Sequence, residues 1–183
     1  MTRTDTSGWP CTIARSADLL GDGWVLLVMR QACLGVRRFE DFQRSLGIGR
    51  KILTIRLKRL VDEGLLGRVE YQHNPVRHEY RLTDKGRDVY PILAAMAAWG
   101  DRWLTGPEGT PLVLHHTGCD HDMQAVVVCS NCAEPIHVRE MRAKAGPGYP
   151  RPDNDISKLD PDDEAPPAAT SAAANPEGKE IRR

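Results

Sequence analysis

The sequence has no long apolar segment of the kind that carries a chain into or across a membrane. Its first ten residues, MTRTDTSGWP, are polar and lack the apolar stretch of a secretory signal peptide. No later run approaches the roughly 20 apolar residues of a membrane-spanning helix. We therefore expect a cytoplasmic protein without a membrane partner. In that reducing compartment the 5 cysteines favour thiol, metal or redox roles over a disulfide framework.

The chain also lacks a net charge, because 25 lysines and arginines balance 25 aspartates and glutamates. The two signs are nevertheless separated along the sequence. Residues 1–105 hold 17 basic and 12 acidic residues (+5), whereas residues 106–183 hold 8 and 13 (−5). Residues 37–59 alone hold 8 basic and 2 acidic residues. Such a stretch attracts polyanions, although a basic run is more often only a solvated surface.

Two further absences limit the range of functions. No paired carboxylates, nucleophile–base pair or phosphate-binding glycine loop stands out, so we expect no enzymatic activity. Residues 146–183 are rich in proline, alanine and acidic residues and lack apolar periodicity. A segment of this composition cannot bury enough surface to offset its ordering entropy, so we predict a disordered tail.

The spacing of apolar residues in the first third of the chain predicts four helices. They span residues 13–20, 24–33, 38–46 and 50–63, and Thr12 is the expected N-cap of the first. The turn Gly47-Ile48-Gly49 separates the last two. Two helices joined by a short glycine-containing turn predict a helix-turn-helix.

The fourth helix has two chemically distinct faces. Its core face is apolar: Leu53, Leu57, Leu60 and Val61. Its opposite arc places one isoleucine among cations: Lys51, Ile55, Lys58 and Arg59. This mixture suits the DNA major groove, where an apolar side chain meets a thymine methyl and cations meet guanine edges and phosphates. The alternative is an ordinary helical hairpin with a charged exterior.

Two short segments of alternating polarity, residues 67–71 and 77–82, follow the fourth helix. The dipeptide Asn74-Pro75 marks a turn between them, so they predict a β-hairpin. A hairpin directly after a DNA-reading helix is a wing, and we expect His73 and Arg77 near its tip to contact the DNA backbone or minor groove.

A long helix is expected from Asp84 to Leu104, with Thr83 as its N-cap. Its apolar residues recur at steps of three and four: Val89, Ile92, Leu93, Met96, Trp99 and Trp103. This stripe predicts a homodimer, because operators with two-fold symmetry favour two-fold dimers. Packing of the stripe against the chain's own first helix is the alternative.

The ordered series of motifs resembles the HxlR-type family of winged-helix regulators, relatives of the MarR group. It includes LGDGW (residues 20–24), LTIRLKRLVDEGLLGR (53–68) and PVRHEYRLTDKGR (75–87), and the resemblance covers residues 11–104. It implies a mainly α fold with a small β wing (α+β), dimerised through terminal helices. It also implies a non-enzymatic repressor or activator of near-palindromic operators. The chain departs from the family at Gly23 and Gly49.

We expect double-stranded DNA to be bound by the basic stretch, the fourth helix and the wing. The expected contacts are Arg37, Arg38, Arg50, Lys51, Thr54, Ile55, Lys58, Arg59, His73 and Arg77. A protein–protein adaptor is the competing function, and the basic outer face of the fourth helix argues against it.

A second cluster lies in residues 110–145, where His116-x2-Cys119 and Cys129-x2-Cys132 are separated by nine residues that include the strand-like run AVVV. Two such pairs predict a small zinc ribbon in which four protein ligands hold one structural ion. Longer members of the family look similar here. The open alternatives are His121 in place of His116, four free side chains, or a Cys129–Cys132 disulfide.

One feature departs from the usual zinc knuckle. Glycine commonly follows the second cysteine, but this chain has Asp120 and Ala133 at those positions.

Cys11 precedes the first predicted helix. A thiol near a helix N-terminus has a lowered pKa, and in some members of the resembled family a cysteine here senses oxidants or electrophiles. The protein could thus be a redox- or metal-responsive sensor, although an inert cysteine at the dimer interface is the simpler interpretation.

The resemblance also allows a small-molecule effector pocket lined by Trp24, Trp99 and Trp103, unless these residues belong to the core.

Overall fold

The computed structural model describes residues 6–144 and 146–148, which form parts of two compact units, residues 1–127 and 128–183. We describe each unit by itself. Most of the predicted tail, residues 149–183, lies outside the described part of the chain. Within the described part, no helix is both long and apolar enough to span a membrane.

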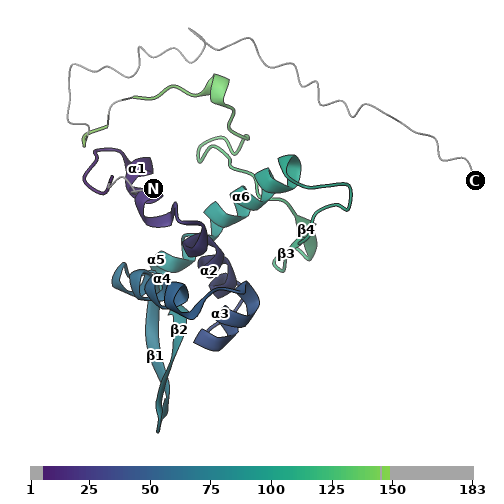
Figure 1. Ribbon diagram of the computed structural model, residues 1–183. Coiled ribbons are helices and arrows are strands. Elements are labelled where there is room, and N and C mark those ends of the chain that lie inside the picture. The colour runs from purple at the N-terminus through teal and green to yellow at the C-terminus, as the bar shows by residue number, and fades with distance from the viewer. Residues whose placement is uncertain (1–5, 145, 149–183) are drawn as a thin grey trace, which may run out of the picture. The chain divides into compact units, whose positions relative to one another are not determined.

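The first unit begins with four helices, continues with a β-hairpin and then returns to helix (Figure 1). The elements are α1 (Thr12–Leu20), α2 (Gly23–Cys33), α3 (Phe39–Leu46), α4 (Arg50–Asp62), β1 (Leu66–His73), β2 (Val76–Leu82), α5 (Asp84–Arg87) and α6 (Tyr90–Trp103). The predicted winged helix-turn-helix of the α+β class is therefore confirmed.

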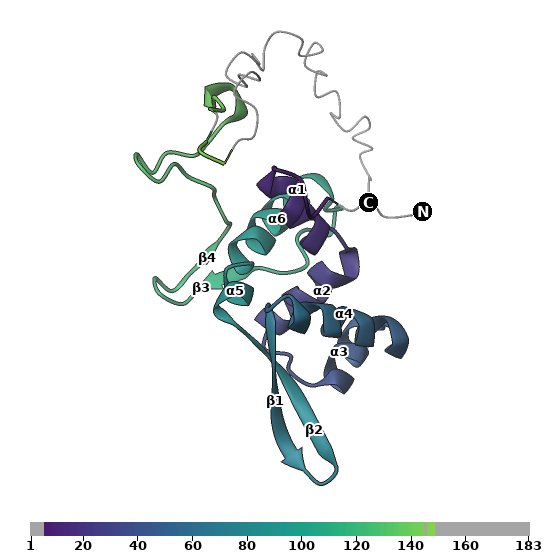
Figure 2. The ribbon, with the colours of Figure 1, turned by 90° about the vertical axis from the view of Figure 1, so that its left-hand side faces the viewer.

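The core of this unit surrounds α2, which contacts α1, α3, α4 and α6. Its largest fully buried side chains come from α2, α3, α4 and the start of the wing: Val25, Val28, Met29, Phe42, Leu53, Leu57, Leu60, Leu65 and Leu66. The predicted core face of α4 is thus correct at three of its four positions, and Val61 is half-buried. Figure 2 shows the wing extending away from the packed helices.

The turn between α3 and α4 depends on its two glycines and on the residue between them. Gly47 ends α3 in the left-handed region, with φ 62°, where glycine carries no steric penalty. Ile48 turns into the core and is 2% exposed. Gly49 is the N-cap of α4. The turn therefore both reverses the chain and anchors α4 to the core.

Helix starts agree with the sequence prediction at one place and differ at two. Thr83 caps α5 as expected, because its Oγ1 accepts the backbone N–H of Gly86 at 3.1 Å. The N-cap of α1 is Cys11 and not Thr12, and no side-chain bond caps that helix. The cap of α2, which we did not predict, is Asp22, whose Oδ1 accepts the N–H groups of Trp24 and Val25.

The single long helix predicted after the wing is wrong, because α5 and α6 are separate helices. Pro91 stands in the first turn of α6, where its missing N–H costs nothing, although the same residue would break a helix that continued from α5. Gly86 in α5 lies so close to the residue before β1 that an added Cβ would be 2.1 Å from the carbonyl oxygen of Leu65. The short α5 therefore docks on the base of the wing, and α6 follows as a new helix.

Beyond α6, the first unit ends in a small hairpin of β3 (Leu114–His116) and β4 (His121–Met123). The strand-like run of residues 125–128 is not a strand, since only Val128 pairs, through an isolated bridge to Pro135 within the second unit. A short 3-10 helix, η1 (Val138–Glu140), follows in that unit.

Candidate nucleic-acid interface

The outer face of α4 is exposed, as the helical period predicts. Lys51, Thr54, Ile55 and Lys58 are all solvent-exposed, and Ile55 retains 49% of its accessible surface. Ile52, beside this arc, is 42% exposed. We call Lys51, Thr54, Ile55 and Lys58 the outer arc of α4. The arc combines an apolar patch with two ammonium groups, which is the chemistry needed to read base edges and neighbouring phosphates.

Two members of the outer arc already have partners within α4. Thr54 donates its hydroxyl to the carbonyl oxygen of Arg50 at 2.9 Å. Lys58 pairs with Asp62, one turn later, at 2.6 Å. Both partners of this ion pair are largely exposed, so the pair stabilises the helix little and can exchange for a phosphate contact.

Arg59 does not lie with the outer arc. Its Nη2 donates to the backbone oxygen of Asp18 at 2.8 Å and approaches the carboxylate of Asp18 at 3.3 Å. The side chain retains 25% of its surface. Arg59 therefore ties α4 to the last turn of α1, and its contact with DNA stays a prediction.

A second arginine fastens α4 to the start of α2. The Nη2 of Arg56 lies 2.6 Å from the Oδ2 of Asp22, and both side chains are mostly buried. Burial by itself raises the pKa of Asp22, but the hydrogen bonds from Arg56, Val25 and Trp24 and the charge of Arg56 outweigh it, so the pKa is lowered. The carboxylate remains ionised, and it both caps α2 and pairs with Arg56 of α4.

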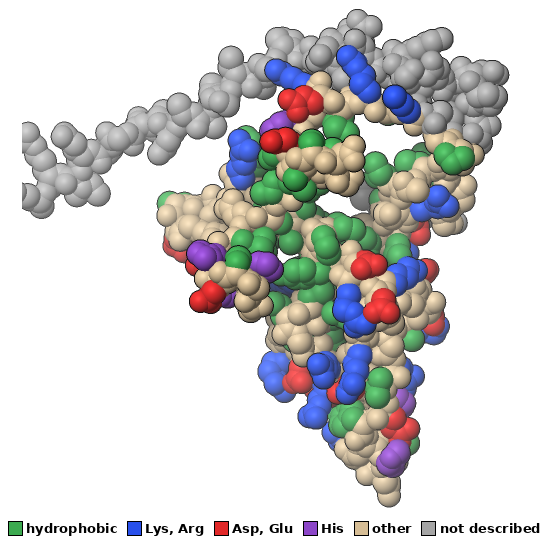
Figure 3. All heavy atoms as spheres, turned by 180° about the vertical axis from the view of Figure 1, so that it is seen from behind, with side chains coloured by type: hydrophobic (Ala, Val, Ile, Leu, Met, Phe, Trp, Pro, Cys, Tyr) green, Lys and Arg blue, Asp and Glu red, His purple; other side chains and the backbone are tan. Residues whose placement is uncertain are grey.

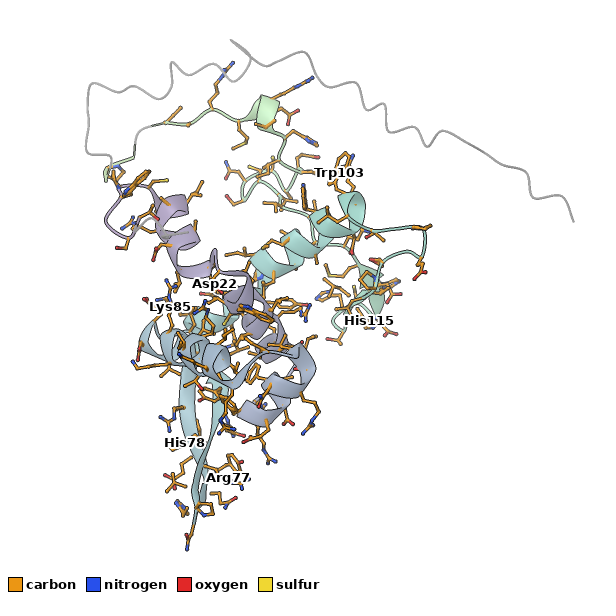
Figure 4. All side chains as sticks on the ribbon, viewed as in Figure 1. Asp22, Arg77, His78, Lys85, Trp103 and His115 are labelled. Carbon is orange, nitrogen blue, oxygen red and sulfur yellow. The ribbon has the colours of Figure 1, made fainter. Side chains whose placement is uncertain are left out.

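A polar hollow of about 350 Å³ lies between the start of α4 and the wing. Four cationic or potentially cationic side chains line it: Arg50, Arg68, Arg77 and His78. Figure 4 shows Arg77 and His78 on the wing strands. Aromatic rings hold part of this wall, since the guanidinium of Arg50 lies 5.0 Å from the centre of the Phe39 ring. Glu40 also lines the hollow, so three arginines and one carboxylate leave it with a net positive charge, and its volume is large enough for a phosphate group.

Sequence analysis missed Arg68 and His78. Arg68 Nη2 lies 2.9 Å from Nδ1 of His78 on the opposite strand, and because a guanidinium only donates, that nitrogen accepts. The sequence contained part of the information needed to find them, since both residues belong to the predicted hairpin. Their pairing depends on the register Glu70↔His78 and on a bulge between Glu70 and Gln72, which the sequence alone does not specify.

The other predicted cations lie in the loop before α3 and at the wing tip, and on the lower part of the face in Figure 3 lysine and arginine side chains gather with acidic side chains among them. Arg37 and Arg38 are exposed in the loop before α3, and the guanidinium of Arg38 lies 4.7 Å from the centre of the Tyr71 ring. This loop joins the wing, because the N–H of Tyr80 donates to Arg37 at 2.7 Å. At the wing tip, His73 contacts Glu70 and its side chain is 93% exposed. Apart from Arg59, the structure therefore gathers the predicted contacts on α4, the wing and the adjoining loop.

The predicted metal ligands fall in two turns, one in each unit. In the first, Nδ1 of His116 lies 3.2 Å from Sγ of Cys119. In the second, backbone N–H groups of Asn131 and Cys132 and the Cys132 thiol donate to Cys129 and lower its pKa. His121 instead contacts the backbone oxygen of Cys119. Both turns thus bring their two predicted ligands together locally.

The remaining predicted sites have mixed surroundings. Cys11 is exposed at the start of α1. Cys33 is half-buried, burial raises the pKa of its thiol, and it lines an apolar cavity of about 490 Å³ between α2 and α6. The three tryptophans expected around an effector do not line this cavity, since Trp99 and Trp103 are exposed on α6 and Trp24 packs on the core.

Comparison with known proteins agrees with this geometry. The model of the HxlR-like helix-turn-helix family matches residues 19–108. A relative from Mycobacterium tuberculosis, described as an HTH-type transcriptional regulator, is 42% identical over 138 residues, which is 75% of this chain and 87% of the relative. A Synechocystis regulator with the same description is 39% identical over 99 residues, covering 54% and 73% of the two chains.

Two solved structures share the fold. The crystal structure of PA1607, described as a candidate transcription factor, has a TM-score of 0.71 at 33% identity and covers 78% of this chain and all of that one. The Pseudomonas aeruginosa protein PA1374 has a TM-score of 0.54 at 36% identity, with coverage of 75% and 93%.

The mycobacterial match extends beyond the winged helix. Any continuous match of about 138 residues in a chain of 183 must include residues 116–132. The similarity thus spans α4, the wing and the two cysteine turns, and the family consists of transcriptional regulators and not of enzymes. On these grounds the chain belongs to the HxlR-like helix-turn-helix family of transcriptional regulators.

Proposed function

We propose that this regulator binds near-palindromic operators as a homodimer and acts as a repressor. The observation that carries the proposal is the outer arc of α4, where Ile55 stands exposed between Lys51 and Lys58 on a helix whose opposite face is fully buried. An isoleucine side chain that is exposed to water on such a helix contributes no favourable free energy of burial. It gains a contact when a thymine methyl covers it in the major groove.

The wing and its hollow supply the contacts that fix the protein on the duplex. Arg50, Arg68 and Arg77 converge on a space large enough for a phosphate group. Contacts to phosphate set register and orientation and carry no sequence information of their own. We therefore assign base reading to the outer arc and positioning to the hollow, with Arg37 and Arg38 as additional backbone contacts.

A second copy of the chain is the proposed partner of α6. The exposed side of α6 is apolar over its whole length: Ile92, Met96, Trp99, Trp103 and the following Leu104. Monomeric proteins rarely leave so continuous an apolar patch in water. A homodimer would cover it and pair two recognition helices with two half-sites. Repression then needs only that the occupied operator excludes other proteins.

Binding-site selection with the purified full-length chain tests this function. Random duplexes should be enriched for an inverted repeat whose half-sites contain thymine, and a protected footprint should cover both halves. Enrichment of a single half-site would contradict the dimer. Failure to enrich any sequence, with binding that depends only on salt, would contradict sequence-specific regulation altogether.

A further inference from the structure

The first two turns of α4 expose two isoleucines to water. Ile52 is 42% exposed and Ile55 is 49% exposed. They are three positions apart, so they are neighbours on the helix surface, with about 5–6 Å between their Cβ atoms. Neither belongs to the apolar side chains that pack on the core of the unit. We call these two residues the isoleucine pair.

The isoleucine pair is not explained by the stability of α4 itself. The core contacts of this helix come from its opposite face, where Leu53, Leu57 and Leu60 are fully buried. Isoleucine is also a poorer helix former than lysine or glutamate, because its branched Cβ restricts χ1. The pair therefore gains favourable free energy only when a surface from outside the chain covers it.

The arginines of α4 already have partners within the chain. Arg50 lies over an aromatic ring of α3. Arg56 pairs at 2.6 Å with the carboxylate that caps α2, and Arg59 donates at 2.8 Å to the backbone of α1. A bidentate contact from arginine to guanine is the commonest specific base contact in the major groove. To make that contact, α4 would have to break one of these interactions.

The polar side chains beside the isoleucine pair are engaged in a similar way. Thr54 donates its hydroxyl to a backbone carbonyl of its own helix at 2.9 Å, and Lys58 pairs with Asp62 at 2.6 Å. In α4, which the structure describes in full, Lys51 is the one basic residue without a partner inside the chain. The surface that α4 offers without breaking a contact is thus two isoleucines with one ammonium group beside them.

We propose that the isoleucine pair reads two adjacent thymines through their C5 methyl groups, which makes Ile52 a specificity-determining residue beside Ile55. The inference rests on the proposed function, because it requires α4 to lie in the major groove. Residues near the start of a recognition helix contact base edges, and the pair occupies the third and sixth positions of α4. Successive bases of one strand rise by about 3.4 Å, so neighbouring side chains meet neighbouring bases.

Replacing thymine with uracil in the selected operator tests this contact, because uracil lacks only the methyl group and keeps the hydrogen bonds of the base pair. At either of the two positions, uracil in one half-site should lower affinity about fourfold, since burying a methyl is worth about as much as burying a methylene. The loss should be the same at low and high salt, because it involves no phosphate. Uracil between the half-sites is the control and should change nothing.

Variants of the isoleucine pair assign each methyl to one side chain. Ile52→Ala should lose the uracil effect at one of the two positions and keep it at the other, and Ile55→Ala should show the reverse. Ile52→Val should keep part of the effect. Ile136→Ala, which changes an isoleucine of equal exposure in the second unit, is the matched control and should keep both effects. Thermal unfolding of Ile52→Ala shows whether the variant remains folded.

This inference and the proposed function fail in different ways. An operator that is enriched as an inverted repeat but binds equally well with thymine and with uracil would overturn the inference and leave the function standing. Half-sites without adjacent thymines, or a folded Ile52→Ala that keeps the uracil effect at both positions, would overturn it too. If no sequence is enriched at all, the proposed function fails and the inference fails with it.

Discussion

At the scale of single residues, α4 divides its side chains among three tasks. Leu53, Leu57 and Leu60 fill the core, Arg56 and Arg59 fasten the helix to its neighbours, and the outer arc is exposed to solvent. The division follows from helical geometry, since 13 residues at 3.6 per turn present every face of the helix to a different environment.

Substitutions on the outer arc should separate base reading from charge. Ile55→Ala should relax the preference for thymine at one position of each half-site, at a cost of about 1–3 kcal/mol, because it removes a methyl contact. Lys51→Ala should weaken binding to the operator by an amount that depends on the salt concentration. Gel-shift titrations on the selected operator measure both, with Lys144→Ala in the second unit as the control. If Ile55→Ala and Lys51→Ala both bound the operator with wild-type affinity, α4 would not be part of the DNA interface.

Arg59 should affect stability more than DNA recognition. Arg59→Ala removes a charged hydrogen bond to the end of α1, so we expect the free energy of unfolding to fall by about 1–2 kcal/mol. Urea titration measures this change, and operator affinity measured well below the transition should change less than in Lys51→Ala. A variant of unchanged stability that no longer binds DNA would instead make Arg59 the direct contact that the sequence suggested.

Sequence reasoning succeeded for α4 where the information was local and failed where a partner came from elsewhere. Periodicity identified the buried leucines and the exposed isoleucine correctly. It could not identify Asp18 as the partner of Arg59, because the two residues are 41 positions apart and only the packing of α1 on α4 brings them together. The pairing of Arg68 with His78 depends in the same way on strand register.

At the scale of elements, the separation of α5 from α6 determines what each helix can do. α5 is fixed at the base of the wing by the close approach of Gly86 to Leu65, by the Thr83 cap and by Lys85, which donates to the backbone of Glu63. α6 begins anew at Tyr90 and contacts α2. Pro91 signals this break in the sequence, but the regular apolar spacing on both sides of it concealed the break.

Polar substitutions on α6 should disrupt the proposed dimer. Met96→Lys combined with Trp99→Lys should give monomers, because both side chains are about half exposed and contribute little to the core of their own chain. Light scattering measures the mass, and thermal unfolding should show that the monomer still folds. Arg102→Ala, on the same helix, is the control and should remain dimeric. A wild-type chain that is monomeric at working concentration would contradict the proposal before any variant is made.

At the scale of the whole molecule, the sequence separates its charge as well as its elements. The half with the winged helix is positive and the remainder negative, so the potential that attracts DNA is confined to one part of the chain. Composition predicted this separation, and in the structure exposed cations of the positive part lie on α4, on the wing and in the loop before α3. The left-handed backbone at Asp120 and Ala133 could not be predicted, because neither a single aspartate nor an alanine requires a positive φ.

A homodimer that reads two half-sites should be sensitive to their spacing on the DNA. Two recognition helices held by one interface reach successive major grooves about 10 base pairs apart on one side of the duplex. Inserting about 5 base pairs between the half-sites of the selected operator rotates one half-site to the opposite side. Affinity should then fall to that of a single half-site, as measured by fluorescence anisotropy at fixed salt.

The controls distinguish spacing from sequence. Insertion of about 10 base pairs restores the rotational phase and should recover more affinity than the half-turn insertion does, although the half-sites are farther apart. The Met96→Lys, Trp99→Lys variant should bind the original and both altered operators equally weakly, because a monomer cannot sense spacing. Wild-type binding that ignores the half-turn insertion would mean that each chain binds DNA alone, and α6 would then need a partner other than a second copy.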